Sequence, residues 1–431
     1  MRKRTVLPAL AGSAALLVAL VGAVAPAAAA PAGAPSLADF ELVRTNGDLQ
    51  AVVDSLDQQL PKLGVQNILE QANRVDAPKG ADCTSPALST NTRPVVGKFC
   101  FEDGDVDTPE WMPQGVTTVA DAQSDELWGE KQAILVSWYD KQTAPVKGVR
   151  VSFLDTDTGN YQHVLLAYPY TNSEGNPSYE QVTTPQSGDG GSVHAGGIVW
   201  YGNYLYVVDT RRGVRVFDMR YIFDIKSAAN GDVTDGAKVG RQNGTYYSYG
   251  YRYVMPQVDG WSNPGGLATF PPDHKCNAAG PQKFSYLGLD RSEEPDAMVT
   301  GEYCADQGDP DLHGRVARWP MNAADGTPSA GGDGVWRATS AYRLAKPRVQ
   351  GAVSTADRWY LHSTGGGETG PGHLQAAVPS GTGNTGVLTT DGAEHDVAIG
   401  VEDLSYWPGR DQLWTVTEHA TKRIVYATSR P

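Results

Sequence analysis

Several features are missing from the 431-residue sequence, and each absence removes a class of protein. Beyond residue 30 no stretch approaches about 20 uninterrupted apolar residues, so we expect no membrane-spanning helix in the mature chain. Neither a G-x-S-x-G nucleophile elbow nor an H-E-x-x-H zinc motif occurs. Cysteine is scarce, with four residues and no C-x2-C spacing, so a zinc site built from thiolates is not expected.

The first thirty residues have the pattern of a secretory signal peptide. Three basic residues, Arg2 to Arg4, precede an apolar run from Val6 to Val24, and an alanine-rich stretch then offers small residues for signal peptidase. Pro8 and Gly12 interrupt the apolar run, which is short for a membrane anchor. The sequence therefore predicts a secreted, extracellular protein.

Positive charge is also scarce. Without the three basic residues of the predicted signal peptide, 32 Lys and Arg remain against 49 Asp and Glu, a net charge of about −17. A chain with this charge repels phosphate backbones and anionic lipids. We therefore expect no nucleic-acid partner and no insertion into membranes.

The four cysteines are interpreted in the light of secretion, because disulfides persist in an oxidising compartment. They form two pairs that are close in the sequence, although three pairings are formally allowed. We predict the two local disulfides, Cys83 with Cys100 and Cys276 with Cys304.

Strand patterns dominate the rest of the chain. In "VHAGGIVWYGNYLYVVDTRRGVRVFDM", residues 193–219, apolar residues recur at period two and two turn signals, Gly202-Asn203 and Arg212-Gly213, separate three strands. The same pattern returns in four other places, so the copies begin near Gln114, His194, Lys283, Gln350 and Glu402. A four-stranded meander repeated around an axis is a propeller blade. The predicted fold is all-β, a five-bladed β-propeller with a short N-terminal helical segment.

The segment before the copies has two expected roles. Leu49, Val53 and Leu56 lie at helical spacing after the cap-type residues 46–48, so residues 36–80 are expected to form helices packed on the propeller. The last copy ends after three strands, and we expect residues 95–101 to donate its fourth strand and close the ring. The predicted division is a signal peptide at 1–30, a helical and closing segment at 31–100, and the propeller at 101–431.

Candidate site residues follow from this fold, because the first strands of the blades begin at the face where the second strands end. Imidazoles, carboxylates and aromatic rings converging on one concave mouth are the default pocket hypothesis. An alternative is that these side chains satisfy backbone groups and waters in a narrow polar channel. The predicted catalytic residues are Glu402, His194 and Glu418; the predicted ligand-binding residues are Gln114, Gln350, His362, Asp209, Glu302, Tyr303 and Trp138.

The blade starts "PQGV", "VQGA" and "VEDL" resemble those of secreted five-bladed glutaminyl cyclotransferases and, more loosely, of gluconolactonase-type propellers. The chain as a whole is similar to secreted actinobacterial propellers. The lactonase resemblance implies a divalent metal held by a Glu, two Asn and an Asp; Glu402 matches the Glu, and no Asn stands at the other blade starts. Resemblance to five-bladed glycosidases implies three carboxylates around the axis, which requires that Asp140, Asp209 or Glu302 point inward.

Two classes of function remain open from the sequence. The ten Trp and twenty Tyr favour a propeller that binds an oligosaccharide or another small molecule at the channel mouth, with hydrolytic activity left open. Carboxylates and imidazoles that can exchange protons favour an enzyme, either a hydrolase or a metal-dependent lactonase or cyclotransferase. A scaffold for protein–protein interaction is a further alternative. The cofactor is unknown, a divalent metal such as calcium is left open, and we expect a monomer.

Overall fold

Two antiparallel meanders joined at their outer strands make up the first sheet of the computed structural model, which describes residues 33–45, 49–142, 146–183, 193–356, 358–380 and 383–431. The outer strands of the two meanders pair in parallel, with Tyr253 opposite Val164. The first meander consists of β4 (Trp111–Thr118), β5 (Ala133–Asp140), β6 (Val149–Asp155) and β7 (Tyr161–Thr171), and the second of β9 (Ile198–Tyr201), β10 (Tyr204–Asp209), β11 (Gly213–Asp218) and β16 (Tyr253–Ser262).

The second sheet repeats this design. Its outer strands β22 and β26 also pair in parallel, with Tyr342 opposite Gly386. Its meanders consist of β17 (Tyr286–Asp290), β18 (Ala297–Gly301), β19 (Arg315–Asn322) and β22 (Ser340–Arg343), and of β23 (Val349–Thr355), β24 (Arg358–Thr364), β25 (Pro371–Pro379) and β26 (Thr385–Ile399).

The third sheet is completed by a strand from the N-terminal segment. It runs β27 (Ser405–Trp407), β28 (Gln412–Val416), β29 (Ile424–Ser429) and β3 (Val95–Cys100), with Val425 opposite Phe99. Since β3 pairs along β29, the last strand of the chain is not a free edge. The segment 95–101 is the one for which the sequence analysis expected this role.

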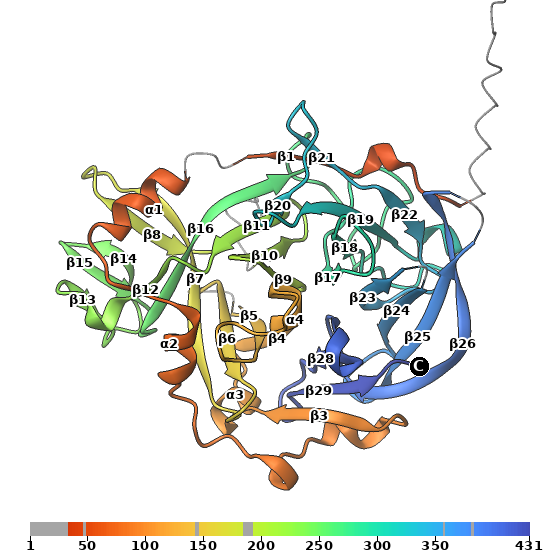
Figure 1. The fold of residues 1–431 in the computed structure, drawn as a ribbon, viewed down its shortest axis with the longest axis horizontal. Coiled ribbons are helices and arrows are strands. Elements are labelled where there is room, and N and C mark those ends of the chain that lie inside the picture. The colour runs from red at the N-terminus through yellow and green to blue at the C-terminus, as the bar shows by residue number, and fades with distance from the viewer. Residues whose placement is uncertain (1–32, 46–48, 143–145, 184–192, 357, 381–382) are drawn as a thin grey trace, which may run out of the picture. The chain divides into compact units, whose positions relative to one another are not determined.

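The meanders are arranged around an axis. Their first strands contact one another in the order β4, β9, β17, β23 and β27, and β27 contacts β4 again, so the cycle is closed. Figure 1 shows β4, β9, β17 and β23 toward the centre of the view and β16, β26 and β3 toward its edge. Sheets packed face to face around an axis, each with its first strand innermost, form a β-propeller.

The period-two pattern in the sequence separates two cores. Ile198 and Trp200 belong to the apolar cluster shared with β4–β7, whereas Val199 and Tyr201 belong to the cluster shared with β17–β19. Alternate residues of a strand point to opposite faces, so each meander fills the space on both of its sides. This is why the strands are buried almost throughout.

The first strands approach closely because of glycine. A Cβ at Gly197 would lie 2.0 Å from the backbone nitrogen of Leu287, and Gly115, Gly288 and Gly351 meet neighbouring strands in the same way. The last meander has Asp403 near the equivalent place, and its carboxylate accepts backbone N–H groups of Val116, Ile198 and Leu287 at 3.2–3.3 Å. Asp403 therefore links three first strands at the axis.

The N-terminal segment contains strands as well as helices, which corrects the prediction of helices over 36–80. Leu49, Val53 and Leu56 are buried on the first helix, as their spacing predicts, but two short strands also extend the first sheet, β1 by pairing with β16 and β2 by pairing with β12. The predicted cap at 46–48 and the predicted signal peptide at 1–30 lie outside the described residues. The segment contains η1 (Leu37–Asp39), β1 (Glu41–Arg44), α1 (Leu49–Asp57), β2 (Lys62–Leu63), α2 (Val65–Glu70), η2 (Gly80–Asp82) and η3 (Pro86–Thr90).

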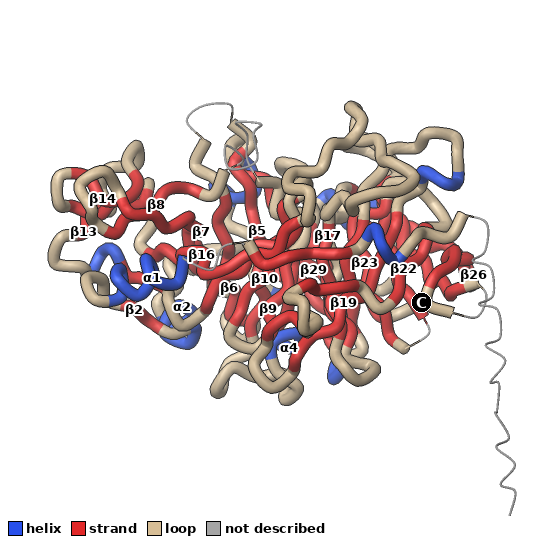
Figure 2. Tube along the Cα trace, turned by 90° about the horizontal axis from the view of Figure 1, so that it is seen from above, coloured by secondary structure: helices blue, strands red, loops and turns tan. Residues whose placement is uncertain are grey.

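Smaller elements decorate the meanders, and Figure 2 shows α1, α2, β13 and β14 at one end of the view, beside β7, β8 and β16. None of the described helices is long and apolar enough to cross a membrane. The remaining elements are α3 (Asp103–Asp107), α4 (Val119–Ala122), β8 (Pro177–Gln181), β12 (Ile222–Asp224), η5 (Ile225–Ser227), β13 (Gly231–Asp232), β14 (Val239–Gln242), β15 (Thr245–Ser248), η6 (Pro310–Leu312), β20 (Thr327–Pro328), β21 (Val335–Arg337) and η7 (Pro408–Arg410).

Both predicted disulfides are confirmed. Cys83 is bonded to Cys100 at the end of β3, and Cys276 is bonded to Cys304 just after β18, with Cα–Cα distances of 5.5 and 5.4 Å. The first disulfide fastens the closing strand to the chain before it. The second joins the loop that precedes β17 to the loop that follows β18.

Candidate functional site

The site lies where first strands begin and second strands end. Antiparallel pairing puts Trp111 opposite Asp140, Tyr286 opposite Gly301 and Val401 opposite Thr417, so the ends of β5, β18 and β28 meet the starts of β4, β17 and β27. Side chains from several meanders therefore reach one end of the axis. We call this end the axial mouth and define it by Gln114, Tyr139, His194, Tyr303, Gln350, Glu402 and Glu418.

Two carboxyl groups occupy the axial mouth. Glu402, just before β27, is 2% exposed, and its side chain is hydrogen-bonded to Glu418 just after β28. Burial, and then the charges of Glu418 and Asp403, raise the pKa of Glu402 well above its ordinary value. A hydrogen bond between two carboxyl groups needs a proton on one of them, and burial assigns it to Glu402.

Two amides hold this carboxyl pair in place. The Nε2 group of Gln350, in β23, donates to Glu402 Oε1 at 3.0 Å, and that of Gln114, in β4, donates to Glu418 Oε2 at 3.0 Å. The Glu418 side chain is 22% exposed, so this carboxylate is the part of the pair that solvent and ligands can reach. The structure brings Gln114, Gln350, Glu402 and Glu418 together.

Aromatic rings border the carboxyl pair. Tyr139, at the end of β5, stacks on His194 with ring centroids 4.6 Å apart and an angle of 11° between the planes. Tyr303, after β18, is hydrogen-bonded to Thr364, and its ring meets His274 edge-on at 5.8 Å. Burial raises the pKa of both tyrosines, and the charges of Glu402 and Glu418 act in the same direction, so both rings lie close to the pair.

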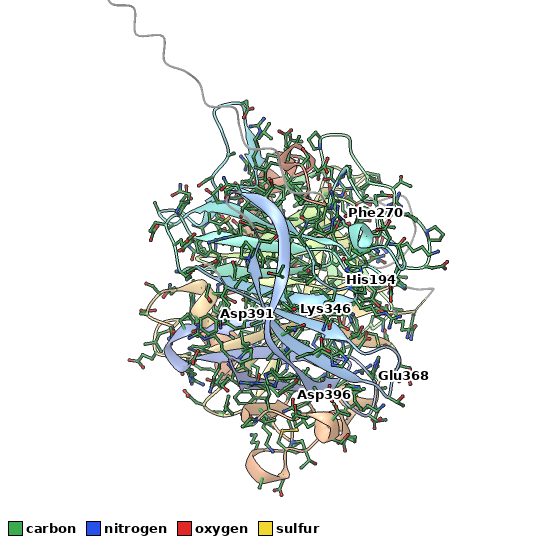
Figure 3. All side chains as sticks on the ribbon, turned by 90° about the vertical axis from the view of Figure 1, so that its right-hand side faces the viewer. His194, Phe270, Lys346, Glu368, Asp391 and Asp396 are labelled. Carbon is green, nitrogen blue, oxygen red and sulfur yellow. A yellow bond between two sulfur atoms is a disulfide. The ribbon has the colours of Figure 1, made fainter. Side chains whose placement is uncertain are left out.

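His194 is a neutral imidazole at pH 7. Its side chain is accessible to solvent, yet surrounding protein lowers its pKa to about 4, with smaller contributions from His274 and Lys283. Accessibility together with desolvation places the ring in a recess rather than in a sealed core. Figure 3 shows His194 and Phe270 toward the same side of the view.

His362 lies beneath the axial mouth and not at its surface. The residue is 1% exposed in β24, and within the described part of the chain neither ring nitrogen makes a hydrogen bond of ordinary geometry. Burial lowers the pKa of His362 to about 3, although the backbone of Glu402 acts in the opposite direction. Direct contact between His362 and a ligand would therefore require a rearrangement.

Three predicted ligand-binding residues are used inside the protein. Glu302 is fully buried and accepts two hydrogen bonds from Arg315, at 2.7 and 2.9 Å. Asp209 accepts two from Arg215 in the same way, at 2.7 and 3.0 Å. Trp138 is buried, donates to Ser152 and packs edge-on against Phe101. We therefore leave all three out of the candidate site.

The acids needed for a three-carboxylate glycosidase arrangement are also engaged elsewhere. Asp140 accepts the backbone N–H groups of Gln142 and Lys147, and Asp209 and Glu302 form the ion pairs described above. Arg215 and Arg315 stand on the third strands of the meanders that contain Asp209 and Glu302. The sequence shows that an arginine is available on the adjacent strand, but not that the acid turns toward it.

Tyr139, Lys283 and His274 are residues of this region that were not predicted as site residues from the sequence. The prediction named Trp138 in place of Tyr139, whereas strand alternation turns the two to opposite faces and Trp138 takes the core side. Lys283 stands at a predicted blade start, but it was not included among the predicted catalytic or ligand-binding residues.

The described residues contain no cluster of three His, Cys, Asp or Glu side chains that is free to hold a metal ion. Their one group of three clustered His, Cys, Asp or Glu ligands is Cys276, Glu302 and Cys304. Those cysteines form a disulfide and Glu302 is paired with Arg315, so none of the three offers a free ligand atom. The Glu, Asn, Asn and Asp set of the lactonase resemblance is not reproduced around Glu402, whose partners are Gln350 and Glu418.

Comparison with known proteins gives distant structural similarity only. No family model matches the chain, and no curated protein matches it. Among solved structures, a glycoside hydrolase is 10% identical, with 85% of this chain and 96% of that chain covered and a TM-score of 0.34. The GH43_1 enzyme from Xanthomonas citri is 8% identical, with coverages of 79% and 91% and a TM-score of 0.31. The PQQ domain of pyranose dehydrogenase from Coprinopsis cinerea is 10% identical, with coverages of 75% and 94% and a TM-score of 0.27. Similarity at this level carries no argument about activity.

Proposed function

We propose that the chain is a secreted five-bladed β-propeller that binds a small polar ligand, an oligosaccharide by preference, at the axial mouth and transfers protons there through Glu402 and Glu418. The observation that carries the proposal is the buried carboxyl pair, in which Glu402 is hydrogen-bonded to Glu418 and each is held by an amide. Such a pair is costly to bury, and perturbed carboxyl groups of this kind cluster at functional sites.

The blade number and secretion are supported by independent features. Five sequence copies and a closed cycle of first strands support five blades. The basic and apolar pattern of the first thirty residues supports secretion, as do two disulfides, because disulfides persist in oxidising compartments.

Oligosaccharide binding is supported by the lining of the axial mouth. Tyr139 and Tyr303 offer flat apolar rings with polar edges, which suit the faces of sugar rings. Gln114, Gln350 and neutral His194 offer donors and acceptors for hydroxyl groups. A protein-binding scaffold is less well supported, since among the described residues the large apolar side chains that are more than a third exposed stand singly, at Val75, Val96 and Tyr170.

The carboxyl pair supports one kind of acid–base chemistry better than another. Two carboxyl groups that flank a glycosidic bond stand about 5–9.5 Å apart, whereas a hydrogen-bonded pair is much closer. Two carboxyl groups that share a proton can instead activate a single water molecule. Glu418, the exposed member of the pair, would accept a proton from the attacking water and then give it to the oxygen of the electrophilic group, while Glu402 keeps its own proton and donates it in the hydrogen bond to Glu418.

The experiment compares Glu402→Gln and Glu418→Gln with Glu174→Gln, a control in the exposed turn between β7 and β8. Calorimetric titration with cellotriose, xylotriose and trigalacturonate, and hydrolysis of acetyl esters of cellotriose and xylotriose, are measured for all variants. We expect the wild type and the control to bind at least one sugar and both site variants to lose at least about 10-fold in affinity or turnover, which is about 1.4 kcal/mol. Unchanged binding and turnover in both site variants would place the ligand elsewhere.

A further inference from the structure

Just before β17, a lysine is buried without an anionic partner among the described residues. Lys283, just before β17, is 8% exposed, and its Nζ makes a single long hydrogen bond, 3.4 Å, to the carbonyl oxygen of Lys275. The ring of Phe270 lies 5.9 Å from the same Nζ. An ammonium group has three donors, so most of the hydrogen-bonding capacity of Lys283 is unused within the described residues.

The nearest acid cannot neutralise this lysine. Glu302 accepts the backbone N–H of Lys283, but both of its oxygens are taken by Arg315 at 2.7 and 2.9 Å. No other carboxylate among the described residues forms an ion pair with Lys283. Burial lowers the pKa of Lys283 to about 8 in spite of the charge of Glu302, so the ammonium is still mainly protonated at pH 7.

Lys283 adjoins the axial mouth through two aromatic connections. His194 stacks on Tyr139, which borders the carboxyl pair, and its pKa responds to Lys283 and to His274. His274 in turn meets the edge of Tyr303, whose pKa responds to Glu402 and Glu418. Lys283, His194 and His274 are therefore connected to the carboxyl pair through Tyr139 and Tyr303.

We infer that Lys283 forms an anion-binding subsite beside the carboxyl pair, so that the preferred ligand carries one carboxylate next to neutral hydroxyl groups. This inference rests on the proposed function, because it names the ligand class of the same mouth. A uronic acid unit within an oligosaccharide has this chemistry, and so does a small organic acid. Aromatic rings and amides around the pair favour the acidic sugar.

The physical argument is a balance of charges. A buried, underused ammonium is unfavourable until an anion reaches it, and a charge-assisted hydrogen bond contributes about 1.5–3 kcal/mol. The corresponding gain in affinity for a carboxylate over its neutral ester is on the order of 10- to 100-fold. Glu418 opposes anions in the other half of the recess, which limits this preference to ligands whose charge lies on the lysine side.

The experiment measures calorimetric affinities of the full chain for trigalacturonate, for its methyl ester and for acetate. The ester keeps the shape of the acidic sugar and removes its charge. Lys283→Met keeps the length of the side chain and removes its charge, and Lys98→Met, on β3, is a control whose Nζ donates to the Cys83 carbonyl. We expect the wild type and the control to prefer the acid at least about 10-fold, and Lys283→Met to bind acid and ester equally.

A second readout separates charge from structural damage. The affinity for trigalacturonate should fall as the pH rises through about 8, where Lys283 loses its proton, while the affinity for the ester stays level. The charged group that acts on the pKa of Lys283 is Glu302, and the neighbouring His194 is already neutral at this pH because its pKa is about 4.

Each outcome separates the two proposals. The subsite is overturned if the wild type binds acid and ester with equal affinity, or if the preference for the acid persists in Lys283→Met. The proposed function still stands in that case if Glu402→Gln weakens ester binding. Tight binding of acetate, with no contribution from the sugar, assigns the subsite to small organic acids. Absence of any sugar or acetate binding overturns both.

Discussion

Asp403 offers the most direct test of how the ring is held together. Its carboxylate accepts the backbone N–H groups of Val116, Ile198 and Leu287, which begin or lie in the first strands of three other meanders. Asp403→Ala removes both oxygens and leaves these three donors facing one another at the axis.

The expected loss follows from counting these donors. A buried donor left without a partner costs about 1–3 kcal/mol, so three cost about 3–9 kcal/mol. Burial raises the pKa of Asp403 well above its ordinary value, although the backbone N–H groups act against this, so removing the carboxyl also relieves some desolvation. We therefore expect a loss of about 3–6 kcal/mol, against a typical domain stability of about 5–15 kcal/mol.

Asp403→Asn is expected to have an intermediate effect. An asparagine keeps one acceptor oxygen but turns an NH2 group toward at least one backbone N–H, so about half of the loss should remain. Urea unfolding followed by tryptophan fluorescence measures both variants. The control is Asp391→Asn on β26, where the Asp391 side chain is paired with Arg358 of β24 and is more than a third exposed. A free energy of unfolding for Asp403→Ala within about 1 kcal/mol of the wild type would refute the axial link.

Other predictions concern the axis, the far end of the ring and its closure. Gly197→Ala should lower the free energy of unfolding by about 3 kcal/mol or more, because its Cβ would lie 2.0 Å from the backbone nitrogen of Leu287. In the control Gly265→Ala the new Cβ would have no atom within 4 Å, so the urea midpoint should change little. Equal midpoints for the two variants would contradict the close approach of the first strands. Asp121 is buried and accepts hydrogen bonds from Thr117 and Ser405, and burial raises its pKa to about 6. The folded state therefore keeps a proton that the unfolded state loses, so the free energy of unfolding of the wild type falls as the pH rises from about 4 to about 6. Asp121→Asn does not titrate, so the difference in free energy of unfolding between this variant and the wild type should grow by about 3 kcal/mol across that window. A difference that does not depend on pH would show that Asp121 is ionised throughout the window. Deletion of residues 31–100 removes β3 and should abolish cooperative unfolding or cause aggregation; a soluble fragment with an unchanged melting transition would disprove the closure.

Much of the fold can be predicted from the sequence because the relevant signals are local. The alternation around Ile198 and Trp200 and the turn at Gly202-Asn203 specify strands and a hairpin, and the order of strands places Gln114, Gln350, Glu402 and Glu418 at one end of the axis. The propeller arrangement follows from repeating that unit.

What could not be predicted depends on which side chains meet. Glu302 and Asp209 end second strands just as Glu418 does, yet each is neutralised by an arginine across its hairpin, and that competition is decided by packing in three dimensions. Asp403 differs from its neighbour Glu402 because the Asp403 carboxylate lies at the axis, where glycines let four first strands approach closely, and accepts the backbone N–H of Ile198 there. Strands β1 and β2 are too short to carry a period that separates them from the flanking helices.

The pairing of β3 with β29 has a consequence for the order of synthesis. Strand β3 is synthesised early, whereas its partner β29 comprises residues 424–429, so the ring stays open until those residues have been made. Until then the edge of β3 is an unsatisfied template for other chains. The disulfide between Cys83 and Cys100 joins two residues that are both synthesised before β29, so it can form before β29 pairs with β3. It then fixes the end of β3 to the chain before it until that pairing takes place.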